Sequence, residues 1–266
     1  MLELLLVFGV ILAILTVFYK QAVCEFRINQ LEWAQREDIR SLMGEKVPLV
    51  VRNLPTATFW SKEDVLSRDC YANIPIFQEM SLVEWTEGAN GGSLCPWGYR
   101  QAEQIASVSG MNVWANKWLH PSIIPKWQRG IWWVPRYHCW AGQKGLHKTI
   151  AAWTYLFPVD GEIVVSIMPE SVENALPAEW QGKFPDEFTA KDTPFLADLK
   201  YMDIILRPGT GLFMPAHWFV SWTSHVVAIS TESANSKDAN STLPMVGSIS
   251  YHTPVSLLAF NTSSHV

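Results

Sequence analysis

Charged residues are scarce in this chain of 266 residues, because they make up only 17% of it, against roughly 25% in an average soluble protein. There are only four cysteines, and no two of them form a C-x-x-C pair, which excludes a disulfide-based scaffold. No run of basic residues occurs and the net charge is -5, so we expect no nucleic-acid partner. Because 48% of the residues are hydrophobic, an intrinsically disordered chain is excluded as well.

The N-terminus carries the longest apolar stretch. No charge interrupts the 16 residues from Leu4 to Tyr19, a length near the lower limit for a membrane-spanning helix. We expect a retained transmembrane anchor over residues 1–19, which contacts the membrane through residues 4–19. The alternative is a cleaved signal peptide, but no Lys or Arg precedes the stretch, and Lys20 stands where a small-residue cleavage site would lie.

The charges that flank this stretch predict its orientation. Lys20, Arg27, Arg36 and Arg40 follow it, whereas only the α-amine precedes it as a positive charge. The positive-inside rule then predicts a single-pass membrane protein with its main domain in the cytoplasm.

The rest of the chain divides into a polar segment and a large domain. Residues 20–46 are polar with spaced apolar positions, which predicts a juxtamembrane helix or stalk that ends near Gly44. Residues 47–266 contain many runs of β-branched and aromatic residues, and no clean linker divides them. They predict one mainly β domain with helical decoration. The runs expected to form strands are Pro48–Asn53, Ile131–Trp140, Thr149–Phe157, Glu162–Met168, Ile204–Leu206, Leu212–Met214, Trp218–Ile229 and Ser250–Phe260.

Four of these blocks, in order and spacing, resemble a known family. Ile204–Phe219 (IILRPGTGLFMPAHWF) is similar to the strand, Pro-Gly turn and Pro-aromatic strand of cupin-like, jumonji (JmjC-type) domains. Gly145–Thr149 stands where that family has its His-x-Asp/Glu motif, Glu162–Pro169 resembles the strand that follows, and Pro48–Asn53 resembles the opening strand. The resemblance spans about residues 46–232 and implies a double-stranded β-helix, a jelly roll of the 2-oxoglutarate oxygenase superfamily.

The resemblance also implies a metal centre, which this sequence does not preserve. Jumonji-type enzymes hold Fe(II) on two histidines and one carboxylate, and leave open positions for oxygen and 2-oxoglutarate. The first histidine maps to His147, the carboxylate to Thr149 and the second histidine to Val220. One ligand of three remains, so we expect no cofactor, with Fe(II) and 2-oxoglutarate only under the alternative that the chain is an active oxygenase. Thr210 likewise replaces the Asp of the family's Pro-Gly-Asp turn.

Other histidines could replace the missing iron ligands, but strand alternation places two of them on the wrong face. His217 and His225 lie three residues before and five residues after Val220, and both therefore face away from its side of a regular strand. His138 lies on the preceding strand and could face inward. The other interpretation of His147 is a hydrogen-bonded core or pocket histidine.

Tryptophan is the abundant residue: there are 14, of which eight lie between Trp97 and Trp153. Core packing and an aromatic cover are one interpretation, and a membrane interface is another. A third is the lining of a pocket, for which Trp153 and Tyr155 are the candidates expected to face inward. Arg136 and Lys144 are the nearby cations that could hold a small acidic ligand.

Three functions from different classes follow. The first is a membrane-anchored jumonji-like binding or scaffold module without iron chemistry, which would bind an unknown protein partner or a small acidic ligand in a pocket that includes Trp153, Tyr155 and Lys144. The second is an active oxygenase, a hydroxylase with an atypical metal site. The third is a structural component of a larger assembly, such as a viral particle, because fold alone does not decide function.

Overall fold

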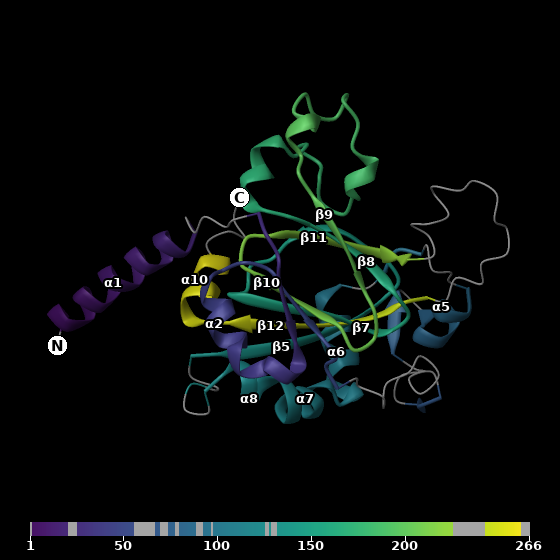
Figure 1. The fold of residues 1–266 in the computed structure, drawn as a ribbon, viewed down its shortest axis with the longest axis horizontal. Helices are drawn as coiled ribbons and strands as arrows, with labels where there is room; N and C mark the ends of the chain where they lie inside the picture. Colours follow the sequence, from purple (N-terminus) through teal and green to yellow (C-terminus); the bar gives the residue numbers. More distant parts are fainter. Residues whose placement is uncertain are drawn as a thin grey trace.

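The computed structural model describes residues 2–20, 26–55, 67–69, 74–77, 80–88, 93–96, 98–125, 128, 132–225 and 243–261 (Figure 1). Residues 226–229, the end of the predicted strand over Trp218–Ile229, therefore lie outside the described residues.

Two β-sheets organise the described chain. The larger has six strands in the order β1 (Asn29–Glu32), β2 (Leu49–Arg52), β10 (Gly211–Pro215), β7 (Trp153–Asp160), β12 (Met245–His252) and β5 (Val134–Ala141). The smaller has four strands in the order β6 (Lys144–Lys148), β11 (Phe219–Ser224), β8 (Ile163–Met168) and β9 (Met202–Leu206). A separate pair joins β3 (Pro75–Phe77) to β4 (Met80–Ser81). The pairings between these strands are antiparallel except that of β1 with β2.

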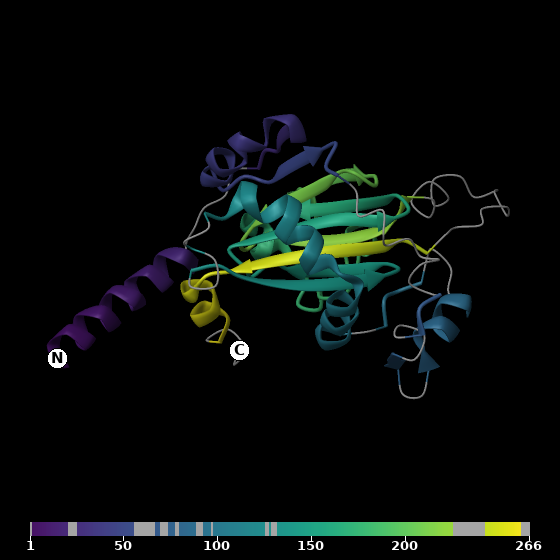
Figure 2. The ribbon, with the colours of Figure 1, turned by 90° about the horizontal axis from the view of Figure 1, so that it is seen from below.

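Helices surround the sheets. The α-helices with described bounds are α1 (Leu2–Lys20), α2 (Ile39–Gly44), α5 (Leu82–Gly88), α6 (Tyr99–Ser109), α7 (Met111–Trp114), α8 (His120–Ile123) and α10 (Pro254–Asn261). Shorter helical turns are η1 (Trp33–Asp38), η2 (Ala115–Leu119), η4 (Glu170–Ala175), η5 (Pro185–Glu187) and η6 (Leu196–Asp198). In Figure 1, α7 and α8 lie below the larger sheet and the smaller sheet lies above it, while α1 extends away from the body of the molecule. Figure 2, which views the molecule from below, also shows α1 extending away from the body.

The predicted fold class, a mainly β double-stranded β-helix preceded by a transmembrane helix, is wrong. The structure is a mixed α/β fold with two sheets, and 38% of it is helical. Helix α6 is not apparent from the sequence pattern, because its buried side is formed by Ala102, Ile105, Ala106 and Ser109. These positions follow the i, i+3, i+4, i+7 spacing of a helix, but three of the four residues are small, so the segment lacks the large apolar stripe that identifies a helix in a sequence.

The predicted membrane anchor is corrected too. Among the described residues, no helix is both long enough and apolar enough to cross a membrane. This finding contradicts the transmembrane helix over residues 1–19 and the single-pass membrane localisation inferred from it. The uncharged stretch from Leu4 to Tyr19 has 16 residues, which is fewer than the roughly 20 that span the hydrocarbon core of a bilayer.

Most of the predicted strands are confirmed, but the last one ends early. The run Ser250–Phe260 is strand only as far as His252, and α10 begins at Pro254. Thr253 and Ser256 cause the change, because the amide of each donates to the side-chain oxygen of the other, at 2.8 and 3.2 Å. This reciprocal capping, together with proline at the first helical position, starts a helix.

The predicted strands Thr149–Phe157 and Glu162–Met168 form β7 and β8, but these strands do not pair with each other. β7 belongs to the larger sheet and β8 to the smaller, so the turn around Gly161 carries the chain between the two sheets. The faces of the two sheets enclose the space in which the candidate site lies.

Candidate functional site

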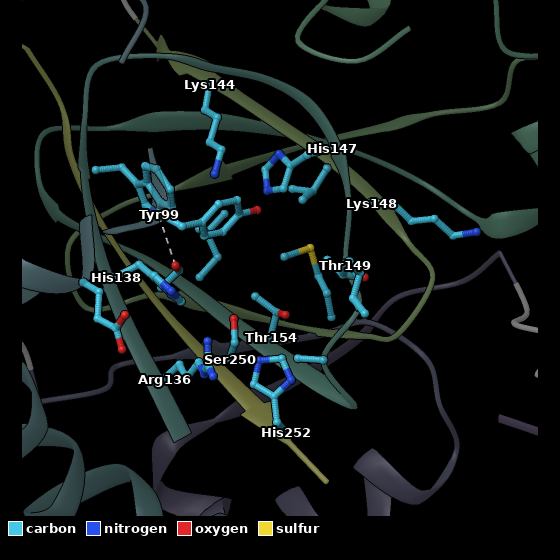
Figure 3. A pocket seen from close by; sticks show the side chains of 18 of the residues that line it. Tyr99, Arg136, His138, Lys144, His147, Lys148, Thr149, Thr154, Ser250 and His252 are labelled. Atoms are coloured by element: carbon cyan, nitrogen blue, oxygen red, sulfur yellow. Dashed lines mark hydrogen bonds between the residues drawn. The ribbon is translucent and has the colours of Figure 1, made fainter. Parts of the chain in front are cut away.

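A cavity of about 480 Å³ lies between the two sheets (Figure 3). This volume falls within the range of about 300–1,000 Å³ that small-molecule sites occupy. Six strands and two helices supply its walls. The lining residues are Tyr99, Glu103, Arg136, His138, Trp140, Lys144, His147, Lys148, Thr149, Ile150, Ala151, Thr154, Leu156, Met214, Val220, Trp222, Ser248, Ser250, His252 and Leu257.

Strand alternation explains most of this lining. On β5, Arg136, His138 and Trp140 lie at every second position and share one face. On β12, Ser248 pairs with His138 and Ser250 pairs with Arg136, so both serines belong to the same face of the larger sheet. The cavity floor is therefore polar and basic, although most of β12 and the second half of β5 are buried.

A β-bulge in β6 breaks the alternation on the opposite wall. Val220 pairs with His147 and Trp222 pairs with Lys144, so two steps along β11 correspond to three along β6. The extra residue places both Lys144 and His147 at the cavity, although regular alternation would separate them. Bulges commonly re-aim side chains next to functional sites.

Lys144 lies inside an aromatic cage formed by Tyr99, Trp140 and Trp222. The distance from its Nζ atom to the ring centroid is 3.3 Å for Trp140, 4.4 Å for Tyr99 and 5.5 Å for Trp222. Within the described part of the chain, no hydrogen bond or ion pair holds this amine. Burial lowers the pKa of Lys144 to about 7, while nearby Cys95 opposes the shift.

Three histidines also border the cavity, and all three are neutral at pH 7. Burial lowers the pKa of His138 to about 4, with Lys144, His252 and Arg136 adding to the shift, and burial beside Arg136 lowers the pKa of His252 to about 4. Burial holds the pKa of His147 well below its usual value. The ring Nδ1 of His147 donates to the Gly145 carbonyl at 3.1 Å, which leaves Nε2 as its unprotonated nitrogen.

Arg136 and Lys144 lie on opposite sides of the cavity, with Arg136 beside Ser250 and His252 (Figure 3). Among the described residues, the Arg136 side chain makes no ion pair or hydrogen bond. The only carboxylate among the lining residues is that of Glu103. Within the part of the chain that the structure describes, the cavity thus presents two cationic groups without a carboxylate paired to either, an arrangement suited to an anionic ligand.

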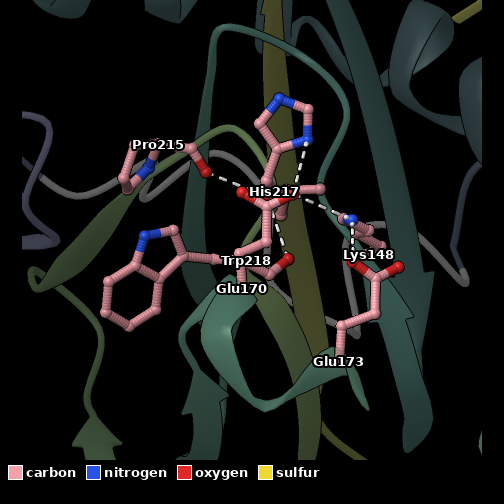
Figure 4. Close-up of polar contacts among 7 residues, drawn as sticks. Lys148, Glu170, Glu173, Pro215, His217 and Trp218 are labelled. Atoms are coloured by element: carbon pink, nitrogen blue, oxygen red, sulfur yellow. Dashed lines mark hydrogen bonds and ion pairs between the residues drawn. The ribbon is translucent and has the colours of Figure 1, made fainter. Parts of the chain in front are cut away.

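Lys148 shows the contrasting case of a lysine whose charge is satisfied. Its Nζ atom lies 3.2 Å from Oε1 of Glu170 and 2.7 Å from Oε2 of Glu173 (Figure 4). His217 faces the same group, with its Nδ1 atom 3.8 Å from Glu170. The backbone of His217 has a φ of 71°, a left-handed conformation that is uncommon outside glycine.

The three positions of the implied iron site do lie together. His147 and Val220 are directly paired, and both line the cavity with Thr149. The Thr149 hydroxyl is shared between the carbonyl oxygens of Pro215 and Trp218, at 2.9 and 3.0 Å (Figure 4). The Thr149 hydroxyl therefore binds the turn between β10 and β11, and Thr149 offers no carboxylate to a metal.

Of the three histidines considered as replacements, His138 lines the cavity, whereas His217 and His225 point elsewhere. His217 is directed at Glu170, and His225 lies 3.5 Å from Glu162. Among the residues that the structure describes, no group of three His, Cys, Asp or Glu side chains is arranged to hold a metal ion. A hydroxyl and an isopropyl group are poor Fe(II) ligands, so the residues around His147 do not fit the implied iron.

The predicted pocket residues separate into two groups. Lys144 lines the cavity, but Trp153 and Tyr155 do not. The other face of β7 provides Thr154 and Leu156, so alternation turns Trp153 and Tyr155 away from the cavity. Tyr155 instead stacks on Phe157 and packs against Phe213, with ring centroids 5.2 and 4.3 Å apart.

Several cavity residues went unnoticed in the sequence. Trp222, Tyr99 and His252 were not identified, although Ser248, Ser250 and His252 form a polar every-second-residue pattern that could have indicated one face of β12. Tyr99 gave no signal, because it belongs to a helix that meets the sheet only in the tertiary structure.

Neither comparison with known proteins assigns the chain to a family: no family pattern matches it, and no curated protein is significantly similar. The jumonji resemblance thus stays a prediction that rests on the motif residues alone.

We predict that replacement of His138 by glutamine makes the free energy of unfolding depend less on pH below pH 6.5. The imidazole is neutral in the fold, with a pKa of about 4 against 6.5 in the unfolded chain. The unfolded state therefore binds more protons between these values, and stability falls as pH decreases from 6.5 to 4. At 1.36 kcal/mol per pKa unit, this group accounts for about 3 kcal/mol across the window.

Urea unfolding at pH 7, 5.5 and 4.5 measures this effect. The wild type should lose stability faster than His138→Gln as pH falls. Both proteins contain the same carboxylates and the same other histidines, so the difference between them reports on His138 alone. Parallel stability curves for the two proteins would show that His138 is not buried in its neutral form.

Proposed function

We propose that this protein is a binding module for a small acidic ligand, held in the cavity between the two sheets, and that it acts without Fe(II)/2-oxoglutarate chemistry. One observation carries the proposal: Arg136 and Lys144 border the same 480 Å³ cavity, and neither is paired with a carboxylate among the described residues. The Lys144 side chain is partly buried, whereas Arg136 is exposed to solvent. A desolvated cation without a counter-ion is unfavourable, so an anionic ligand would supply the charge that Lys144 lacks, and Arg136 would pair with the same ligand.

The cavity also favours a ligand with a flat apolar body. Trp140 and Trp222 supply aromatic walls, and Met214, Leu156 and Val220 supply aliphatic ones. Small-molecule sites combine such apolar walls with a few polar groups that fix orientation. An aromatic or unsaturated carboxylate would place its charge at Arg136 and its body between the sheets.

The oxygenase alternative requires a ligand set that these residues do not provide. His147 is the only metal-binding side chain at the three implied positions, since the others are Thr149 and Val220. Stoichiometric iron that is lost in His147→Ala, or succinate formed from 2-oxoglutarate, would overturn this part of the proposal.

We predict that the protein distinguishes naphthalene-2-carboxylate from its neutral isostere naphthalene-2-carboxamide. A charge-assisted hydrogen bond to Arg136 is worth about 1.5–3 kcal/mol, so we expect the carboxylate to bind at least about tenfold more tightly. Isothermal titration calorimetry measures both affinities, and quenching of Trp140 and Trp222 fluorescence provides an independent signal.

Arg136→Met should abolish this preference while it keeps an unbranched side chain of similar length. Arg207→Met is the matched control, because Arg207 is 65% exposed and its Nε atom lies 3.0 Å from Glu162, away from the cavity lining. Equal affinities for the acid and the amide in the wild type, or an unchanged preference in Arg136→Met, would contradict the proposal.

A further inference from the structure

We propose that Lys144 is a nucleophilic amine that forms an imine with an aldehyde group of the ligand. This inference rests on the proposed function, because it names the reactive group of the acidic ligand that the cavity would hold. Geometry carries it: among the described residues the Lys144 amine has no hydrogen-bond or ion-pair partner, three aromatic rings surround it at the cavity wall, and a β-bulge directs it there.

The bulge and its surroundings show that the position of Lys144 is built into the fold. Gly145 follows it directly, and a Cβ atom at that position would lie 1.9 Å from the Gly182 carbonyl oxygen. The segment around Gly182 pairs with β6, because its amide donates to the Leu146 carbonyl at 2.9 Å. Close backbone packing thus holds the bulge, and the bulge directs Lys144 inward.

Burial keeps a fraction of the Lys144 amine unprotonated. Four titratable groups face it: Cys95 from the segment before α6, Tyr99 from α6, His138 from β5 and His147 from its own strand. Two of these are neutral imidazoles, and burial dominates the shift of the lysine pKa to about 7. A desolvated lysine of this kind is a typical carbonyl nucleophile.

The reaction balances without an oxidant or a metal. The neutral amine attacks the carbonyl carbon, a C–N bond forms, and the carbinolamine then loses water to give C=N. The amine loses both of its protons to the departing water and the aldehyde loses its oxygen. His147 lines the same wall, and its unprotonated Nε2 can accept a proton during this exchange.

Two groups on opposite sides of the cavity then define the ligand class. Arg136 would hold an acidic group, and Lys144 would bond to an aldehyde carbon separated from it by an apolar body. The probe 4-carboxybenzaldehyde has this composition: a carboxylate, a benzene ring and an aldehyde.

The experiment incubates the full chain at pH 7 with 4-carboxybenzaldehyde and sodium cyanoborohydride, whose hydride reduces the imine to a stable secondary amine. Mass spectrometry of proteolytic peptides locates the adduct. We expect labelling of Lys144 at least about tenfold faster than of Lys148, which lies on the same strand but is paired with Glu170 and Glu173. An ordinary lysine with a pKa near 10.4 is almost fully protonated at pH 7.

Two variants and a pH series separate reactivity from simple accessibility. Lys144→Arg keeps the positive charge but cannot form an imine, so the rapid label should disappear. Lys200 is exposed and lies outside the cavity lining, so Lys200→Arg should retain the label. The labelling rate of Lys144 should level off above pH 7 to 8, because the pKa of its amine is about 7. Uniform labelling of the lysines, or no label at Lys144, would overturn the inference.

A non-carbonyl probe distinguishes this failure from failure of the proposed function. Calorimetry with 4-methylbenzoate tests acid binding alone. If 4-methylbenzoate binds with Arg136 dependence and Lys144 stays unlabelled, the binding function stands and the imine is excluded. If 4-methylbenzoate does not bind and Lys144 stays unlabelled, both proposals fail.

Discussion

Replacement of Trp222 by alanine is expected to lower the free energy of unfolding by about 3–5 kcal/mol, the usual cost of truncating a large buried aromatic side chain. Trp222 is 1% exposed, and its ring packs against those of Trp140 and His147 at centroid distances of 6.3 and 5.5 Å. Its indole nitrogen also donates to the Gly142 carbonyl at 3.2 Å. The substitution would remove this bond and merge the lost side-chain volume with the existing cavity.

Chemical denaturation measures the loss, and Trp132→Ala is its matched control. Trp132 is 53% exposed, so its truncation should change stability by no more than about 0.5 kcal/mol. Comparable losses in the two variants would mean that Trp222 is not part of the packed core. A Trp222→Ala protein that remains folded should also show slower imine labelling, because Lys144 loses one wall of its cage.

Replacement of Gly145 by alanine is expected to cost about 3 kcal/mol or more, at the upper end of overpacking effects. The new Cβ atom would lie 1.9 Å from the Gly182 carbonyl oxygen and 2.2 Å from its carbonyl carbon. These are backbone atoms, so no side-chain rotation relieves the clash. The Gly182 segment cannot withdraw without breaking its hydrogen bonds to Leu146, which are 2.8 and 2.9 Å long.

Thermal and urea unfolding would measure this effect, with Gly44→Ala as the control. Gly44 ends α2, and a Cβ atom there meets nothing within 4 Å, so we expect no loss and a gain of up to about 1 kcal/mol. An unaltered stability of Gly145→Ala would show that the bulge adapts. If the variant folds, displacement of Lys144 should remove its selective labelling.

The candidate site could be predicted from the sequence only in part. The sequence points to Arg136 and Lys144 as cations near the tryptophan-rich region and to His147 as the one remaining ligand of the implied iron site, and all three line the cavity. Trp153 and Tyr155 were assigned to the wrong side, because the face of β7 that meets the smaller sheet depends on the register between sheets. Tyr99 and Trp222 escaped notice, since a single strand or helix does not show which aromatic rings will surround one amine.

Local chemistry by itself determined where most strands lie. β-branched and aromatic runs bounded by proline and glycine turns were sufficient, because strand formation depends on neighbouring residues within a few positions. The loss of two of the three implied iron ligands, at Thr149 and Val220, is likewise visible in the sequence, because it depends only on which side chains are present.

Only the tertiary structure decided what occupies the space between the sheets. Helix α6 buries small residues against β5. The sequence of this segment has no stripe of large apolar residues that would indicate a helix. The inward direction of Lys144 depended on a bulge held by Gly182, which lies 37 residues further along the chain than Gly145. Contacts between such distant segments arise from packing, and packing selects a register that local residue preferences leave open.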